Sequence, residues 1–195
     1  MSRSAIVEAA SELFAERGFP GTTVADIQTA AGLTPGSGAL YKHFGSKEEL
    51  FATCVEAALA DIDRTSDAAA AALTSDDLST TLRMLVVAGL GHMDRQRPLI
   101  RLLFQDGHRF PDLRDAFRDQ GVRPTYDGFA AWLGAEAKRG RIRAVDAKAV
   151  AAILVGSVVA YRFTHELIGE PPARIAKARF IDAWVELALT ALAPR

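Results

Sequence analysis

The sequence predicts an all-α fold of about nine helices, three short ones followed by longer ones. Apolar residues recur at helical spacing along almost the whole chain, and no sustained alternation of apolar and polar residues indicates a half-buried strand. Glycines and prolines stand at intervals that would end or begin helices. The 195 residues are 49% hydrophobic and 24% charged, which is typical of a globular chain that buries a substantial core.

The composition also limits which partners the protein can bind and which cellular compartment suits it. The formal net charge of −1 provides no overall attraction to nucleic acid or anionic lipid, so any such affinity must be local. The chain has a single cysteine, Cys54, and its N-terminal stretch MSRSAIVEAA lacks an apolar signal core, so we expect a reducing cytoplasm. The apolar run 149–161 is too short to span a bilayer and indicates a helix buried on several sides.

The N-terminal region predicts three helices. The first has an apolar stripe from Ile6 to Phe14, and Gly18 would end it in a left-handed cap. A capping box of Thr23 and Asp26 would begin a short helix over 24–31. The third short helix would end with the letters LYKHF, and a second capping box at 46–49 would then begin a long helix reaching about residue 64.

Further helices follow from the same signals. We expect a helix from 74–77 to about 95, one from Pro98 to Gly107, a divided one from Pro111 to Gly140, one from Asp146 to Gly169 and a last one over 173–192. The domains would be a small N-terminal unit at 1–50, a connecting helix at 46–64 and a larger helical domain at 65–195.

Three short helices with a tight turn before the third predict a helix-turn-helix, which places its last helix in the major groove of DNA. Hydroxyl, imidazole and ammonium side chains gather there, and all of them can contact phosphates or base edges. The charge is weak: across 22–47 two lysines stand against one aspartate, a net +1. The N-termini of helices and a second copy of the chain would have to supply further attraction for the DNA phosphates.

Residues 6–52 resemble the N-terminal domain of TetR-type transcriptional regulators. The resemblance rests on "IVEAASELFAERGFPGTTVADIQTAAGL" followed by "LYKHFGSKEEL" and covers about a quarter of the chain. It implies phosphate contacts from Thr23, Tyr41 and Lys47. It also implies that Thr34, Pro35, Gly36, Ser37, Gly38 and Ala39, with Lys42 and His43, face the bases or the groove wall. One departure is plain: five residues separate Thr34 from Leu40, where the commoner family spacing has three.

Two other interpretations of residues 31–50 compete with DNA binding. A phosphate-binding Walker loop needs Gly-Lys-Ser/Thr after a strand, whereas this stretch has Gly-Ala-Leu after a helix. A purely structural helix-loop-helix is the second. Two residues added inside a helix would rotate everything beyond them by about 200°, so we expect the addition at the entry to the recognition helix.

Segment 84–133 combines apolar and aromatic residues with single polar ones, which is typical of a small-molecule site and equally of a helix-bundle core. The resemblance implies a pocket among these helices for a small, largely apolar effector. The candidate lining residues are Met84, Ala88, His92, Leu103, Gln105, His108, Phe129 and Trp132.

The last two helices predict a homodimer interface, because the first of them is apolar over more than half its circumference. A fully internal helix of a monomer is the alternative. The candidate interface residues are Val150, Ile153, Leu154, Ser157, Val158, Tyr161, Phe180, Trp184 and Leu187.

We find no nucleophile–base pair, metal-ligand spacing or cofactor motif, so we expect neither an enzyme nor a metal or cofactor. The hypothesis is a ligand-responsive repressor that binds a near-palindromic DNA operator as a dimer and is released by its effector. The alternative is a helical small-molecule-binding or interaction protein without sequence-specific DNA binding.

Overall fold

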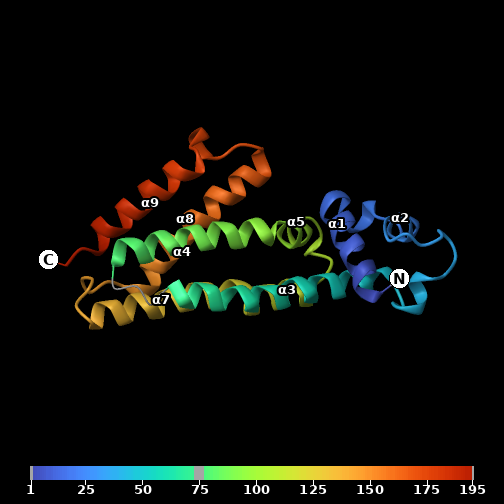
Figure 1. The fold of residues 1–195 in the computed structure, drawn as a ribbon, viewed down its shortest axis with the longest axis horizontal. Helices are drawn as coiled ribbons and strands as arrows, with labels where there is room; N and C mark the ends of the chain where they lie inside the picture. Colours follow the sequence, from blue (N-terminus) through green and yellow to red (C-terminus); the bar gives the residue numbers. More distant parts are fainter. Residues whose placement is uncertain (1, 73–76, 195) are drawn as a thin grey trace. The chain divides into compact units, whose positions relative to one another are not determined.

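The computed structural model describes residues 2–72 and 77–194, without the side chains at 61–72, 98, 99, 102 and 105. The described residues are mostly helical (Figure 1) and contain no strand, which confirms the all-α prediction. The α-helices are α1 (Arg3–Gly21), α2 (Val24–Ala30), α3 (Lys47–Ala72), α4 (Leu78–Arg95), α5 (Arg97–Asp106), α6 (Pro111–Phe117), α7 (Arg123–Lys138), α8 (Ala147–Ile168) and α9 (Lys177–Leu192). Shorter elements are the 3-10 helices η1 (Leu40–Lys42) and η3 (Pro172–Arg174) and a π-helical turn, η2 (Arg118–Val122).

The described helices form two compact units. Unit 1 comprises residues 1–63 and 95–120, and unit 2 comprises 64–94 and 121–195. Helices α5 and α6 therefore pack with the N-terminal helices although they follow α4 in the chain. The assignment of 1–50 and 65–195 to separate functions remains a prediction.

Unit 1 is built around four phenylalanines. Phe14 lies edge-on to Phe51 at 5.2 Å between ring centroids, and Phe19 packs against Phe51 at 5.1 Å. Phe110, just before α6, stacks on Phe51 at 4.4 Å and meets Phe19 edge-on at 5.0 Å. Such aromatic pairs add to the stability gained from burial itself. The aromatic core thus joins α1, α3 and the segment that leads into α6.

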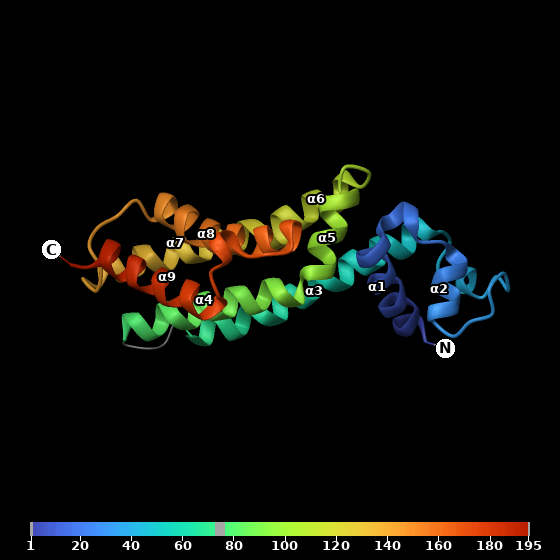
Figure 2. The ribbon, with the colours of Figure 1, turned by 90° about the horizontal axis from the view of Figure 1, so that it is seen from above.

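Unit 2 packs α4, α7, α8 and α9 around a second core, with α7 lying along α8 (Figure 2). Its members include Leu82 of α4, Leu133 of α7 and Ala188 of α9, each 0% exposed. Glu136, 1% exposed, lies in the last turn of α7 and pairs with Arg139 and Arg141. A carboxyl group buried without such partners would be costly to the folded chain.

Many helix ends lie where the sequence predicts them. Thr23 and Asp26 form the predicted capping box, Asp146 caps α8 through the N–H of Ala149, and Gly169 ends α8 at φ +86°. Gly18 interrupts α1 with φ +71°, and one helical turn follows before α1 ends at Gly21. These positions suit glycine because other residues are strained at positive φ.

One element differs from the prediction. The predicted third α-helix, ending with "LYKHF", does not form: the chain turns through 34–39 and makes only the 3-10 helix η1 at Leu40–Lys42. Gly36 and Gly38 hold φ values of +76° and +67°, which no α-helix accommodates. The added residues therefore replace the recognition helix by a loop, where the sequence led us to expect a helix with a longer entry.

Helix α8 is also longer than the apolar run seen in the sequence. By length and composition its 22 residues could cross a membrane, and 22% of its most apolar window is buried in this chain. It is the one such helix among the residues that the structure describes. Three of its apolar residues, Ile153, Leu167 and Ile168, are exposed in the single chain.

Candidate nucleic-acid interface

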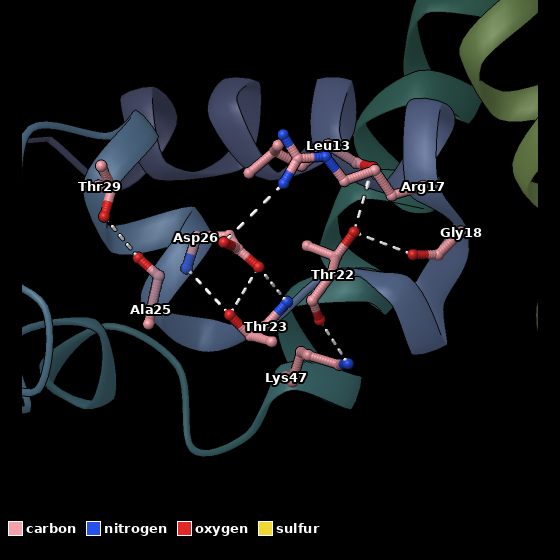
Figure 3. A network of polar contacts seen from close by, with 9 residues as sticks. All are labelled: Leu13, Arg17, Gly18, Thr22, Thr23, Ala25, Asp26, Thr29 and Lys47. Carbon is pink, nitrogen blue, oxygen red and sulfur yellow. Dashed lines mark hydrogen bonds and ion pairs between the residues drawn. The ribbon is translucent and has the colours of Figure 1, made fainter.

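The turn between α1 and α2 is fixed by hydrogen bonds from threonine (Figure 3). Thr22 is fully buried, and its hydroxyl donates to the carbonyl oxygens of Leu13 at 3.1 Å and Gly18 at 2.9 Å. The next residue, Thr23, accepts from the N–H of Asp26 at 3.1 Å, and its own N–H donates to the Asp26 carboxylate at 2.9 Å. This reciprocal cap satisfies N–H groups that the start of α2 would otherwise leave unpaired.

Asp26 is a half-buried residue whose carboxyl group is held in its charged form. Hydrogen bonds from the Thr23 hydroxyl and then the Thr23 N–H lower the pKa of Asp26, and Arg17 adds a smaller electrostatic effect. The guanidinium of Arg17 lies 3.8 Å from the carboxylate (Figure 3). Asp26 thus neutralises part of the positive charge near α2, and the Thr23 hydroxyl is engaged with it at 2.6 Å.

Lys47 has a structural role that the sequence did not reveal. Its ammonium donates to the carbonyl oxygens of Phe19 and Thr22, both at 2.7 Å, and lies 4.1 Å from the centre of the Phe19 ring. Figure 3 shows the side chain reaching Thr22 from the start of α3. A cation at the end of a helix is favourable because it meets unpaired carbonyl groups there. The phosphate contact suggested for Lys47 stays a prediction.

The buried side chain of Gln28 holds the loop 34–39 by a hydrogen bond to the loop backbone. This α2 side chain is 1% exposed, and its amide oxygen accepts from the N–H of Gly36 at 2.9 Å. The carbonyl oxygen of Gln28 also accepts from the N–H of Leu33 at 2.7 Å. The sequence contains no pattern that indicates this role, because the two partners of the first bond are eight positions apart and lie on either side of the end of α2.

Beyond the loop, buried and exposed residues alternate so that polar groups face outwards. Leu40 and Phe44 are 0% and 1% exposed and anchor η1 in the core of unit 1. Tyr41 is 55% exposed, and Lys42 and His43 are exposed as well. Most of the residues assigned to DNA contact are exposed, namely Thr23, Thr34, Pro35, Gly36 and Ser37 together with the three just named, while Gly38 and Ala39 are half-buried.

Arg3 adds a basic group that sequence reasoning missed. Its guanidinium lies 4.6 Å from the centre of the Phe44 ring and donates to the hydroxyl of Thr53 at 3.4 Å. The contact brings the start of α1 beside η1, and no local pattern links residues so far apart in sequence. The exposed charge near the loop is thereby more positive than the count over 22–47 suggests.

The effector candidates are divided between the two units. Phe129 and Trp132 stack in unit 2 at 5.4 Å between ring centroids. Met84, Ala88 and His92 lie on α4 of the same unit, and Met84 is 44% exposed. Leu103 packs on the core of unit 1, and His108 is exposed there. The side chain of Gln105 lies outside the described residues.

The dimer candidates separate into a buried and an exposed set. Leu154, Val158, Tyr161 and Trp184 are buried in the core of unit 2, whereas Val150, Ser157 and Phe180 are half-buried. Ile153 and Leu187 are each 69% exposed, and at the end of α8 Leu167 and Ile168 are 66% and 70% exposed. The exposed set forms apolar surface on α8 and α9, whereas the buried set belongs to the core of unit 2.

A charged cleft lies within unit 2. Its volume is about 330 Å³, and Asp94 in its wall accepts from Arg162 at 2.6 Å and from Lys177 at 3.1 Å. Burial raises the pKa of Asp94, but these two hydrogen bonds and charges outweigh it, so the pKa is lowered overall. No cluster of three or more potential metal ligands occurs in the part of the chain that the structure describes.

Two N-terminal helices, α1 and α2, followed by the loop 34–39 and η1 with exposed polar side chains, are typical of the class of DNA-binding regulators. The model for bacterial regulatory proteins of the tetR family matches residues 6–54, and that for the C-terminal domain of AefR-like transcriptional repressors matches 87–194. The second match spans more than half of the chain, and the chain belongs to the TetR family of transcriptional regulators.

Relatives agree over the N-terminal part. The transcriptional repressor KstR2 of Mycobacterium tuberculosis is 52% identical over 48 residues, which are 25% of this chain and 23% of KstR2. The regulator TtgR of Pseudomonas putida is 43% identical over 76 residues, 39% of this chain and 33% of TtgR. The chain thus matches about a quarter to a third of the length of these curated relatives.

Solved structures extend the likeness to the whole fold. A TetR-family regulator of Mesorhizobium loti is 25% identical, with a TM-score of 0.73 and 96% of this chain and 95% of the other covered. The protein AibR, solved with isovaleryl coenzyme A and operator DNA, is 20% identical with a TM-score of 0.68, covering 95% of this chain and 96% of AibR. The latter likeness concerns the fold alone.

Proposed function

We propose that the chain is a ligand-responsive repressor that binds a near-palindromic DNA operator as a homodimer and leaves it when a small effector binds. The observation that carries the proposal is the Gln28-anchored loop 34–39 with the exposed side chains of Tyr41, Lys42 and His43 beside it. Loop and η1 side chains would contact bases and groove walls, and the hydroxyl of Tyr41 would contact phosphate.

A single copy carries little positive charge for this purpose. Lys42 is exposed and Arg3 lies close to η1, but Asp26, Glu48 and Glu49 stand nearby in sequence. Affinity for DNA depends strongly on the number of phosphates that cations neutralise. Pairing two copies doubles that number and sets the spacing of two half-sites, so we infer a dimer with a near-palindromic operator.

The exposed apolar residues of α8 and α9 support a two-fold interface. Ile153 and Leu187 are exposed in the single chain, and a self-complementary contact would bury both from each copy. Burial of such side chains stabilises by about 1.5–3 kcal/mol each. An interface of this kind also accounts for a helix as apolar as α8 without any membrane, in agreement with an expected cytoplasmic location.

Effector control needs a connection from the ligand to the DNA-binding helices. The segment 95–120 lies within the match to the C-terminal domain, yet it packs in unit 1 through Phe110 and Asp106. We propose that a ligand which shifts α5 and α6 also shifts α1, through its different affinity for the two arrangements. This adds a second connection to the one along α3. AibR is named with both a ligand and operator DNA, which supports the same logic here.

We propose that the protein acts by binding and not by catalysis, which its membership of a family of transcriptional regulators supports. One observation favours the alternative of an interaction protein without operator binding: the loop that replaces the recognition helix. Selection of bound fragments from the source genome by purified protein distinguishes the two. Recovery of fragments that share a near-palindromic sequence supports the repressor, and recovery of unrelated fragments overturns it.

A further inference from the structure

The cleft of unit 2 has one apolar wall and one charged wall. The apolar wall consists of Leu90, Pro171 and Ala176 together with Tyr161, whose hydroxyl already donates to the carbonyl oxygen of Ile175 at 2.9 Å. The volume of about 330 Å³ lies at the lower end of the range of small-molecule sites, about 300–1,000 Å³. The cleft therefore has room for a small organic molecule with an apolar part.

The charged wall contains two cations that share one carboxylate. Arg162 and Lys177 each donate to a different oxygen of Asp94, and Arg162 also donates to Glu166 at 3.4 Å. A guanidinium carries five N–H donors and an ammonium three, and three of these donors are bonded within the described residues. Both oxygens of Asp94 are thus engaged, whereas the cations can donate further hydrogen bonds to a ligand.

This arrangement favours an anion over a cation. A cationic ligand would meet the like charges of Arg162 and Lys177, which already occupy the carboxylate of Asp94. Ala176, the N-cap of α9, has no side-chain acceptor, so the first N–H groups of that helix add partial positive charge at the same wall. A carboxylate also matches a guanidinium, because its two oxygens accept from two parallel N–H groups.

The proposed dimer contact on α8 leaves the charged wall uncovered. Arg162 and Ile153 are nine residues apart on this helix, about two and a half turns, so they lie on opposite faces. The side chain of Arg162 is 14% exposed and belongs to the cleft, whereas Ile153 is 69% exposed. A ligand would therefore reach the cleft while a second copy covers Ile153.

We propose that this cleft is the effector site and that its ligand is a small organic carboxylate. The ligand carboxylate would accept from Arg162 and Lys177, and its apolar part would lie along Leu90 and Pro171. It would compete with Asp94 for the same two cations. Asp94 stands in the last turn of α4, directly before α5, so the competition would loosen the end of α4 that leads into α5. The inference rests on the proposed function, in which a ligand acts through α5.

Benzoate and benzamide test the site, because they have the same shape and only benzoate is charged. The DNA-free protein is acetylated with an N-hydroxysuccinimide ester, and mass spectrometry of its peptides gives the rate at each lysine. Benzoate is expected to slow the acetylation of Lys177 in a saturable way and to leave Lys148 unchanged, since Lys148 is exposed at the start of α8 outside the cleft. Benzamide is expected to bind about tenfold more weakly, because hydrogen bonds between two charged partners are stronger.

Substitutions on the two sides of the ion cluster should act in opposite directions, as measured by calorimetric titration with benzoate. Lys177→Gln removes a cation and should weaken binding about tenfold. Asp94→Asn removes the competing carboxylate and should strengthen binding by up to about fivefold, the effect of an exposed ion pair. Lys148→Gln and Asp127→Asn are the matched controls at exposed positions, and both should bind benzoate like the wild type.

Several results would overturn the carboxylate site. They are an unprotected Lys177 up to the solubility limit of benzoate, equal slowing at Lys148, equal binding of benzoate and benzamide, and an Asp94→Asn protein that binds benzoate less tightly than the wild type. Inorganic phosphate that protects Lys177 as well as benzoate would show an unspecific anion site, in which the apolar wall has no part. If Lys177→Gln does not fold, the two probes on the wild type still decide.

Operator binding is measured separately by fluorescence anisotropy. Its absence would overturn the proposed repressor without touching the protection of Lys177. Conversely, an unprotected Lys177 in a protein that binds its operator overturns the cleft site alone. Saturating benzoate is expected to weaken operator binding, and an unchanged operator affinity would overturn the role of the cleft as the effector site.

Discussion

The backbone N–H of Phe19 donates to the carboxylate of Asp106 at 2.7 Å, across 87 residues of chain. Asp106 is 3% exposed and stands at the end of α5, and Phe19 follows the interruption of α1 at Gly18. A charged acceptor makes this bond stronger than one between neutral groups. The bond fixes the end of α5 to the last turn of α1, directly before α2, and under the proposed function it would transmit a movement of α5 to α1 and α2.

Replacing Asp106 should therefore weaken unit 1. Asp106→Ala leaves the Phe19 N–H without its acceptor, and we expect the free energy of unfolding in urea to fall by about 1–3 kcal/mol. Asp127→Ala is the matched control, because Asp127 is exposed on α7; it should change stability by less than about 0.5 kcal/mol. Equal effects of the two substitutions would show that the bond contributes nothing.

Gln28 should position the DNA-reading loop. Gln28→Met keeps the length and burial of the side chain but removes the oxygen that accepts from Gly36, so the loop loses its fixed conformation. We expect operator affinity to fall about tenfold, which corresponds to about 1.4 kcal/mol, with a changed preference among operator variants. Anisotropy titrations against a set of single-base variants measure both.

The control for Gln28 is Gln120→Met, since Gln120 is exposed on η2. It should bind the operator like the wild type. If Gln28→Met also keeps its affinity and preference, the loop does not depend on this bond.

The two lysines near the interface should behave differently. Lys42 is exposed, and Lys42→Ala should leave stability unchanged while lowering the slope of log affinity against log salt by about 0.9 for each lost phosphate contact. Lys47→Met removes donors to Phe19 and Thr22, so the free energy of unfolding should fall by about 1–3 kcal/mol. Salt titrations and urea melts of both variants test the contrast. A Lys47→Met protein of wild-type stability would contradict the structural role and favour phosphate contact alone.

The exposed apolar residues of α8 and α9 should hold the dimer together. Ile153→Glu and Leu187→Glu place charges where the structure exposes apolar side chains, each 69% exposed. Buried charges without partners are strongly unfavourable, so each variant should sediment as a monomer and lose operator affinity. Ala131→Glu, at an exposed position of α7, should remain dimeric. Dimers of wild-type strength in the first two variants would place the interface elsewhere.

Cys54 should be inert in the folded protein. Burial raises the pKa of its thiol from 9.0 to about 11, so at pH 8 almost none of the reactive thiolate exists. Ellman's reagent should label the thiol slowly in buffer and rapidly in urea. Above pH 9 the unfolded chain releases this proton before the folded chain does, so stability should decline as pH rises from about 9 to 11. Rapid labelling of folded protein would contradict the burial.

Local signals in the sequence predicted much of the fold. Helix ends such as those at Thr23, Asp146 and Gly169 depend on residues three or four positions apart, so the sequence shows both partners together. Contacts across the chain have no such signal: the bond from Phe19 to Asp106 and the contact of Arg3 with Phe44 arise only from packing.

The recognition element shows the limit most clearly. The residue types of this element predict contact with DNA, but the predicted recognition helix runs across Gly36 and Gly38. Each of these glycines costs a helix about 1 kcal/mol relative to alanine. With the amide of Gln28 available to bind the loop, the irregular conformation becomes favourable. The sequence does not indicate this role of Gln28, because a glutamine that is buried in the fold looks in the sequence like any polar residue on the surface of a helix.

The central claim is that this loop-based helix-turn-helix binds DNA in a sequence-specific way. The direct measurement is the dissociation constant for the intergenic DNA upstream of the chain's own gene and for a scrambled duplex of equal length, each at several salt concentrations. We predict nanomolar affinity for the former, affinity weaker by a factor of about 10³ or more for the latter, and a steep loss of affinity with salt for both. Equal affinities for the two duplexes at every salt concentration would contradict the account.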